Sequence, residues 1–276
     1  MPTKHSDSEA ESAYLYARSF FKEQSPKTYW SLWLFTTREN FRHFVCIYAY
    51  FRWADDIVDA PQRDAEKVQG FCLEQETLIK QERAPQTSLE KALLLSIQAP
   101  QKGDVFQRIC LKMWESLSFD AHRPSFVRPQ KELFLQICRI GDSYAQALWA
   151  CSQAKGEMPN ALQWLARAAT ATHHLRDIDE DLELRYCNIP QEAIAHYGLD
   201  PDDLSWPNRA PYILERSNEI FLWFARGFEA LPLISHLPTR LLFWLFGYRY
   251  KKVLLKIQKK AIFFCKSRPE KYRSSL

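Results

Sequence analysis

Residues 41–59 read FRHFVCIYAYFRWADDIVD, and their spacing predicts a helix with one aromatic and acidic face. Side chains three and four positions apart share a helix face, so Phe44, Tyr48 and Arg52 form one stripe. The stripe ends in a cluster of three carboxylates: Asp55, Asp56 and Asp59. Clustered carboxylates repel one another and Asp is a poor helix former, so the arrangement is costly without a cation. Its oxygen ligands suit Mg²⁺, and the alternative is a solvated helix end.

A second acidic cluster occurs in residues 175–181, LRDIDED. Helical spacing places Asp177, Glu180 and Asp181 on one face, with Arg176 beside them. Two DxxxD clusters, each next to an arginine, predict motifs that face each other across a helical bundle and hold Mg²⁺ ions that bridge to a diphosphate. Arg52 and Arg176 are then expected to contact the diphosphate oxygens.

These two motifs predict a reaction as well as a binding site. The aromatic stripe is expected to line an apolar cavity for a hydrocarbon tail. Mg²⁺ and arginine neutralise a leaving diphosphate, so an allylic carbocation is expected to form in a dry aromatic pocket. Upstream of the second motif, Thr170 and His173 are expected to line the same cavity.

Helical periodicity dominates the rest of the chain and predicts a single all-α domain, residues 1–276, of about ten helices. We expect residues 1–10 to be a flexible N-terminus. The expected helices span residues 8–22, 38–59, 63–83, 88–98, 104–118, 130–154, 159–185, 190–198, 211–230 and 238–265. Gly is scarce, with seven residues, and no GxGxxG or GxxxxGK[ST] occurs, which excludes the dinucleotide and P-loop motifs.

Charge and cysteine content indicate where the protein acts. The net charge of +4 is too small to argue for nucleic acid, but basic residues gather in residues 240–273. That basic, aromatic end predicts either peripheral contact with an anionic membrane or a solvated helix face. Seven scattered cysteines without a CxxC pair suit a reducing, cytoplasmic compartment. No apolar run approaches the length of a membrane-spanning helix.

Residues 48–59 resemble the first aspartate-rich motif of the squalene and phytoene synthases. Residues 175–181, followed by NIPQE at 188–192, resemble the second. The resemblance covers roughly residues 25–260. It implies an isoprenoid-synthase helical bundle around a central cavity, a prenyl diphosphate substrate, Mg²⁺ dependence and peripheral membrane behaviour.

The chain departs from the family pattern around the expected acceptor region. Residues 138–145 read CRIGDSYA where the family has an aromatic and glycine-rich segment. Asp142 stands where a cavity-lining Gly is expected, and it is expected either to pair with Arg139 at i, i+3 or to face the cavity. Asp142 and Tyr144 are therefore the catalytic candidates. Thr170 and His173 replace the usual Gln and Asn.

Three functions remain open at this level. The first is head-to-head coupling of two allylic diphosphates into a squalene-like or phytoene-like product. The second keeps the ionisation but transfers the cation to a non-prenyl acceptor, for example an aromatic one, or cyclises it. The third is a non-enzymatic assembly protein, against which the complete acidic motifs argue.

Overall fold

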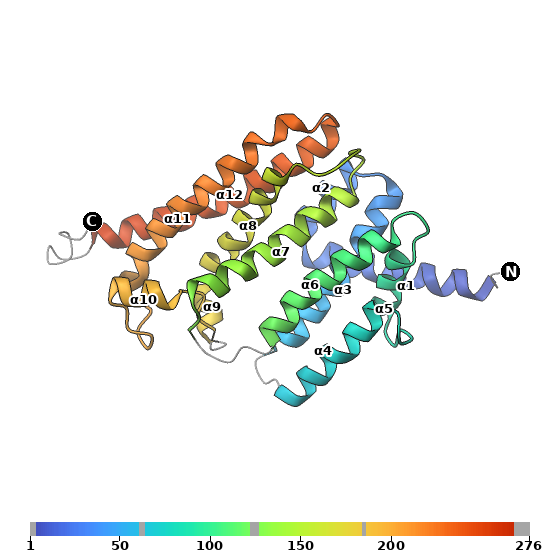
Figure 1. Ribbon diagram of the computed structural model, residues 1–276, viewed down its shortest axis with the longest axis horizontal. Helices are drawn as coiled ribbons and strands as arrows, with labels where there is room; N and C mark the ends of the chain where they lie inside the picture. The colour runs from blue at the N-terminus through green and yellow to red at the C-terminus, as the bar shows by residue number, and fades with distance from the viewer. Residues whose placement is uncertain (1–3, 61–63, 122–126, 184–185, 268–276) are drawn as a thin grey trace. The chain divides into compact units, whose positions relative to one another are not determined.

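The computed structural model describes residues 4–60, 64–121, 127–183 and 186–267. Over these residues the chain forms twelve α-helices and two short 3-10 helices, and backbone pairing between extended residues is limited to two isolated bridges (Figure 1). The predicted all-α class is confirmed.

The helices run as follows along the chain: α1 (Lys4–Gln24), α2 (Pro26–Phe35), α3 (Arg38–Val58), α4 (Ala65–Ile79), α5 (Ser88–Ile97), α6 (Gly103–Ala121), α7 (Gln130–Ala150), η1 (Asn160–Leu162), α8 (Gln163–Arg176), α9 (Ile178–Glu183), α10 (Gln191–Tyr197), α11 (Trp206–Glu229), η2 (Leu231–Leu233) and α12 (Leu237–Lys266).

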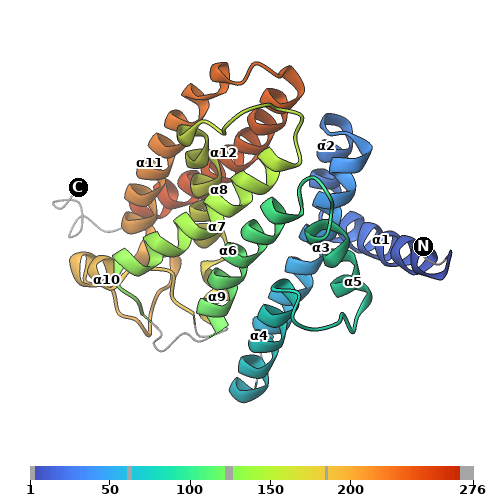
Figure 2. The same ribbon diagram turned by 45° about the vertical axis from the view of Figure 1, so that its right-hand side comes forward.

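The chain divides into two compact units, and the first contains α1 to α6. It comprises Met1–Arg123, Ser143–Met158 and Pro232–Leu242. α3 packs against α1 and α5, and the three helices lie together in both views (Figures 1 and 2). The side chain of Thr37 caps α3 by accepting a hydrogen bond from the backbone N–H of Asn40. This N–H lies in the first turn and has no acceptor within the helix, so the cap stabilises the helix start.

A buried polar network ties three helices of the first unit together. Glu90 is 1% exposed and pairs with Arg83 at 2.5 Å. Gln75 donates to Glu90 at 2.8 Å and accepts from the Tyr50 hydroxyl at 3.0 Å. Glu90 also completes a capping box with Thr87 at the start of α5. A buried carboxylate is stable here because each oxygen has donors.

The second unit contains α8 to α11 and most of α12. It comprises Pro124–Asp142, Pro159–Leu231 and Phe243–Leu276. α8 packs on α11, and glycines allow close helix approach: a Cβ at Gly141 would lie 2.7 Å from the backbone nitrogen of Arg167. α12 runs antiparallel to α11, since Gln258 donates to Asn218 and Phe264 stacks on Trp206 (Figure 2).

The observed elements differ from the expected ones in several places. The helices expected over 63–83 and 130–154 each end four residues earlier, and α1 begins four residues before 8. α2 was not expected, although Ser25 followed by Pro26 is a typical helix start. The helix expected over 159–185 begins as a 3-10 turn and divides at Asp177 into α8 and α9. α11 begins at Trp206 rather than 211, with Pro211 inside it. Sequence reasoning ended the preceding loop at that proline, whereas tertiary contacts of Trp206 and Arg209 extend the helix.

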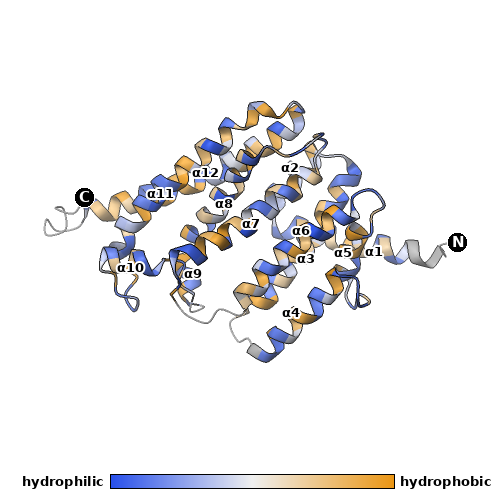
Figure 3. Cartoon of the chain, viewed as in Figure 1, coloured by the Kyte–Doolittle hydropathy of each residue, from blue (hydrophilic) through white to orange (hydrophobic). Residues whose placement is uncertain are grey.

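Hydrophobic and hydrophilic residues alternate along the helices (Figure 3). Among the described residues, no helix is both long and apolar enough to cross a membrane. The expectation of one domain over residues 1–276 stays a prediction. Residues 4–10 belong to α1, while residues 1–3 of the expected flexible N-terminus lie outside the described residues.

Candidate functional site

The first aspartate motif lies at the end of α3 in the first unit. The backbone N–H of Asp59 donates to the carbonyl of Asp55 at 2.8 Å, so these two residues are one helical turn apart. Both are partly buried, whereas Asp56 is exposed. Arg52 reaches Asp55 at 3.3 Å and Asp56 at 2.7 Å. Arg52 therefore links Asp55 and Asp56, and Asp56 is the least enclosed of the three acids.

The aromatic stripe of α3 is packed within the first unit. Phe44 is 3% exposed and meets the ring of Tyr144 edge to face at 6.0 Å. Tyr48 lies 4.2 Å from the ring of Phe21 and remains partly exposed. The structure thus brings the candidates Phe44, Tyr48 and Tyr144 together. Tyr48 is the more accessible residue of the stripe.

The second motif spans the bend between α8 and α9. Asp177 ends α8 with φ −96° and ψ 6°, outside the helical region. The N–H of Asp181 donates to the carbonyl of Asp177 at 2.8 Å, which is the same one-turn spacing as in the first motif. Both carboxylates are partly buried, and Glu180 is exposed. Asp179, Glu180 and Asp181 fall in the first turn of α9, where the helix dipole favours acids.

Asp177 is held by two basic neighbours. Arg176 donates to both of its oxygens, at 2.5 and 2.6 Å, and the Nδ1 atom of His173 lies 3.6 Å away. Burial acts to raise the pKa of Asp177, but the interactions with His173 and Arg176 outweigh it and hold the pKa at about 2. Asp177 is therefore ionised throughout the physiological range. His173 also meets the hydroxyl of Tyr250 at 2.9 Å.

Distant residues support the rest of the second motif. Asn188 donates to Asp181 at 2.7 Å, and the buried Arg128 reaches Asn188 at 3.4 Å. Asp179, which is not a predicted ligand, pairs with the buried Arg209 and accepts from the indole of Trp206 at 3.0 Å. Sequence reasoning did not assign Arg128 or Arg209 because no local pattern links them to the motif.

Asp142 has a partner other than the expected one. Both of its oxygens accept hydrogen bonds from Arg167 of α8, at 2.6 and 2.7 Å. The close crossing of α7 and α8 at Gly141 brings Arg167, rather than only a residue of the same helix, to the carboxylate. Thr170 donates to the carbonyl of Ala166, one turn back in its own helix.

Each motif offers a pair of partly buried carboxylates one turn apart. Such oxygen donors suit a hard cation that keeps several waters. Within the described residues, no group of three or more His, Cys, Asp or Glu side chains is gathered closely enough to enclose a metal by itself. The motifs belong to different units, so their apposition across a bundle stays a prediction.

Known proteins place the fold in context. A sequence model of the family described as squalene/phytoene synthase matches residues 21–261, which include both aspartate motifs. No curated protein matches the chain at a significant level.

Solved structures support the same fold. The crystal structure of squalene synthase HpnC from Alicyclobacillus acidocaldarius is 17% identical, with a TM-score of 0.69 over 92% of this chain and 96% of that one. A dehydrosqualene synthase in complex with ligand is 16% identical, with a TM-score of 0.71 over 95% and 99% of the two chains. At these identities the likeness concerns the fold alone. The family match covers most of the sequence, and on that ground the chain belongs to the squalene/phytoene synthase family, a family of prenyltransferases.

Proposed function

We propose that the protein is a Mg²⁺-dependent enzyme that ionises an allylic isoprenyl diphosphate and couples two prenyl chains head to head. The observation that carries this proposal is the repeated pair of partly buried carboxylates with an arginine beside them. The pairs are Asp55 with Asp59 and Asp177 with Asp181. Bound Mg²⁺ would neutralise the leaving diphosphate.

The two arginines have a second role in this proposal. Arg52 and Arg176 now donate to the motif carboxylates. When a cation takes those carboxylates, the planar guanidinium groups become available to the diphosphate oxygens, which they fit in a bidentate manner. In the second motif, Asn188 and His173 hold the two aspartates in position while this exchange occurs.

The hydrocarbon is expected to contact the aromatic side chains of the first unit. Tyr48 presents a partly exposed ring next to the buried Phe44, and Tyr144 packs against Phe44. Ring faces stabilise a nearby cation without offering a nucleophile. Tyr48 is therefore the first contact that we assign to the prenyl chain, with Tyr144 behind it.

The pairing of Asp142 favours coupling over the alternatives. Arg167 donates to both oxygens of Asp142 and fixes this carboxylate in position. An acceptor with an N–H or O–H group would have to share the carboxylate with Arg167. Terpene cyclisation after the same ionisation remains a competing outcome of the product assay. Membership of a prenyltransferase family favours an enzyme over an assembly protein.

Contact with a membrane is proposed through α12. Trp244 and Tyr248 are exposed and stacked at 5.0 Å, and Lys252 lies 4.7 Å from the Tyr248 ring. Exposed aromatic rings with lysines are typical of an interfacial helix. We expect binding to anionic vesicles that salt weakens, measured by cosedimentation. Equal binding to neutral vesicles would favour a merely solvated helix face. The basic residues beyond 267 lie outside the described residues.

The deciding experiment is a product assay. The protein is incubated with geranyl, farnesyl and geranylgeranyl diphosphate and Mg²⁺, with and without a nicotinamide reductant, and the extract is identified by mass spectrometry. We expect a hydrocarbon of doubled chain length, and no diphosphate release in excess chelator. Asp59→Asn and Asp181→Asn should each lower release by roughly 100-fold or more. Glu183→Gln, an exposed acid of α9, is the control.

Two results would contradict the proposal. Full turnover in excess chelator would remove the metal from the mechanism. A prenylated non-prenyl acceptor or a cyclic product, in place of the doubled chain, would favour the second reading of the site.

A further inference from the structure

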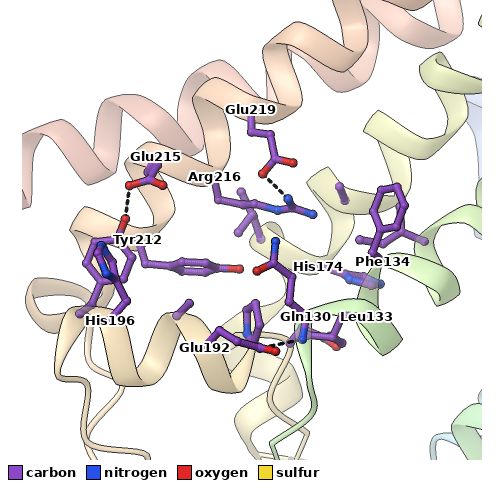
Figure 4. A pocket seen from close by; sticks show the side chains of 17 residues that line it. Gln130, Leu133, Phe134, His174, Glu192, His196, Tyr212, Glu215, Arg216 and Glu219 are labelled. Carbon is purple, nitrogen blue, oxygen red and sulfur yellow. Dashed lines mark hydrogen bonds and ion pairs between the residues drawn. The ribbon is translucent and has the colours of Figure 1, made fainter.

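The second unit contains a pocket of about 340 Å³ that the proposed prenyl transfer does not use. It lies between the start of α7, the end of α8, α10 and α11 (Figure 4). His174 lines it, whereas the preceding His173 contacts Tyr250 and Asp177. Asn188, which donates to Asp181 of the second motif, also lines the pocket, so the pocket lies next to this motif and opens on the side of α8 that carries His174. The volume suits a small organic molecule.

The lining carries an excess of negative charge. Three glutamates contribute to it: Glu192, Glu215 and Glu219. Glu219 is neutralised by Arg216 (Figure 4). Arg216 also lies over the ring of Trp223. Glu192 accepts from the backbone N–H of Gln130 at 2.7 Å, and Glu215 accepts from the Tyr197 hydroxyl. In the described part of the chain, neither Glu192 nor Glu215 has a cationic partner. With His174 and His196 counted as neutral, the pocket therefore keeps two uncompensated carboxylates.

A buried hydroxyl points into the same space. Tyr212 is 6% exposed, and its side chain extends from α11 toward the middle of the pocket (Figure 4). Its hydroxyl makes no hydrogen bond with any residue that the structure describes. Burial raises the pKa of this hydroxyl, so it is a neutral group that is able to accept a hydrogen bond. The hydroxyl therefore faces the pocket with its hydrogen-bonding capacity unused by the described protein groups, and a ligand in the pocket can bind to it.

The remaining walls are apolar. Leu133, Phe134 and Ile137 of α7 line the pocket, and Phe134 packs edge to face on Trp223 at 5.8 Å. An aromatic wall attracts a cation and also accommodates an aromatic or aliphatic body. Carboxylates, a hydrogen-bond acceptor and an aromatic wall together select a ligand that is positive at one end and apolar at the other.

We propose that this pocket binds a small organic ammonium ion with an apolar or aromatic body. The ammonium group lies on the side of Glu192 and Glu215 and donates a hydrogen bond to the Tyr212 hydroxyl. The apolar body packs against Phe134 and its neighbours on α7. An organic anion meets two like charges and is rejected.

The test measures how tightly three probes of similar shape bind to the full chain. The probes are phenethylamine, the neutral 2-phenylethanol and the anionic 3-phenylpropanoate. Affinities are measured by calorimetry, and amide shifts in α10 and α11 locate the site. We expect the amine to bind roughly tenfold or more tightly than the alcohol, and the acid to bind most weakly. Glu215→Gln and Tyr212→Phe should each weaken amine binding about three- to tenfold. Glu229→Gln, exposed on α11 outside the pocket, is the matched control and should change nothing.

Several results overturn the proposal. These are equal affinity for amine and alcohol, unchanged affinity in both pocket variants, and no site-specific shift at millimolar phenethylamine. Glu215 is on the surface, so its variant tests the site even where Tyr212→Phe disturbs folding. The readout is binding without any prenyl diphosphate, so a failure here leaves the proposed function standing.

Discussion

The two aspartate motifs share one spacing but differ in what holds them. In the first motif, Arg52 binds Asp55 and Asp56 from three and four positions away on the same helix, and its side chain is 44% exposed. In the second motif, side chains from other segments reach the acids: Trp206 and Arg209 of α11 bind Asp179, and Asn188, with Arg128 behind it, binds Asp181. Tyr250 of α12 contacts His173, which in turn lies next to Asp177.

This difference separates local from tertiary positioning. An exposed i, i+3 or i, i+4 pair contributes little to stability and rearranges easily. A motif braced by buried residues keeps its geometry, and disturbing the bracing costs folding free energy. The contacts of Asp179 and Asp181 with distant side chains therefore preorganise the second motif, whereas the exposed pair of Arg52 and Asp56 in the first motif rearranges easily.

The largest effect is expected on activity, where the two motifs should behave alike. Arg52→Gln and Arg176→Gln should each lower kcat/KM by roughly 100-fold, because each removes a contact with the developing negative charge of the diphosphate. Steady-state diphosphate release measures this. Lysine at either position should recover only part of the loss, since it lacks the bidentate fork. A large loss at one arginine and none at the other would contradict the proposal that both arginines bind the diphosphate.

The second effect is on stability and should be confined to the second motif. Asp179→Asn removes the charge that compensates Arg209, whose side chain is 1% exposed, so the free energy of unfolding should fall by roughly 2 kcal/mol. This loss is smaller than for a fully buried ion pair because the Asp179 side chain is 63% exposed. Urea denaturation measures it. An unchanged urea midpoint would show that the pair of Asp179 with Arg209 does not stabilise the fold.

The third effect is a pH dependence of the second motif. The pKa of Asp177 is about 2 in the folded chain against an ordinary 3.8. A lowered folded pKa stabilises the protein above about pH 4, and this contribution is lost as the pH falls toward 2. Asp177→Asn should therefore lower the free energy of unfolding by roughly 1 to 2 kcal/mol at pH 7 and by less at pH 3. A constant difference across this range would contradict the assigned pairing.

The smallest effect concerns the exposed acid of the first motif. Asp56→Asn breaks its pair with Arg52, where both side chains are 44% exposed, and should change the free energy of unfolding by less than about 0.5 kcal/mol. Denaturation under the same conditions as for Asp179→Asn gives the comparison. A loss as large as that of Asp179→Asn would mean that the first motif is braced as firmly as the second.

Much of the fold was predictable because its signals are local. The all-α class follows from helical periodicity and scarce glycine, and α3 was expected within one residue of its observed end. Ser25 followed by Pro26 was a readable start signal for α2, and the acids of residues 179–181 were a readable start for α9. These two errors came from missed local chemistry.

Other features had no local signal. The pairing of Asp142 with Arg167 depends on two helices crossing at Gly141. The early start of α11 accompanies the contacts of Trp206 and Arg209 with Asp179. No spacing rule connects residues 30 positions apart, because such pairs form only when whole helices pack.

The sequence by itself determined which side chains share a helix face, and hence that Asp55 with Asp59 and Asp177 with Asp181 lie one turn apart. It did so because backbone hydrogen bonding sets a fixed rise and rotation per residue. Only the tertiary structure decided which of these carboxylates are held from outside their own helix, and that the side of α8 that carries His174 faces a pocket. Those features depend on the packing of side chains from distant segments, for which the one-dimensional pattern carries no rule.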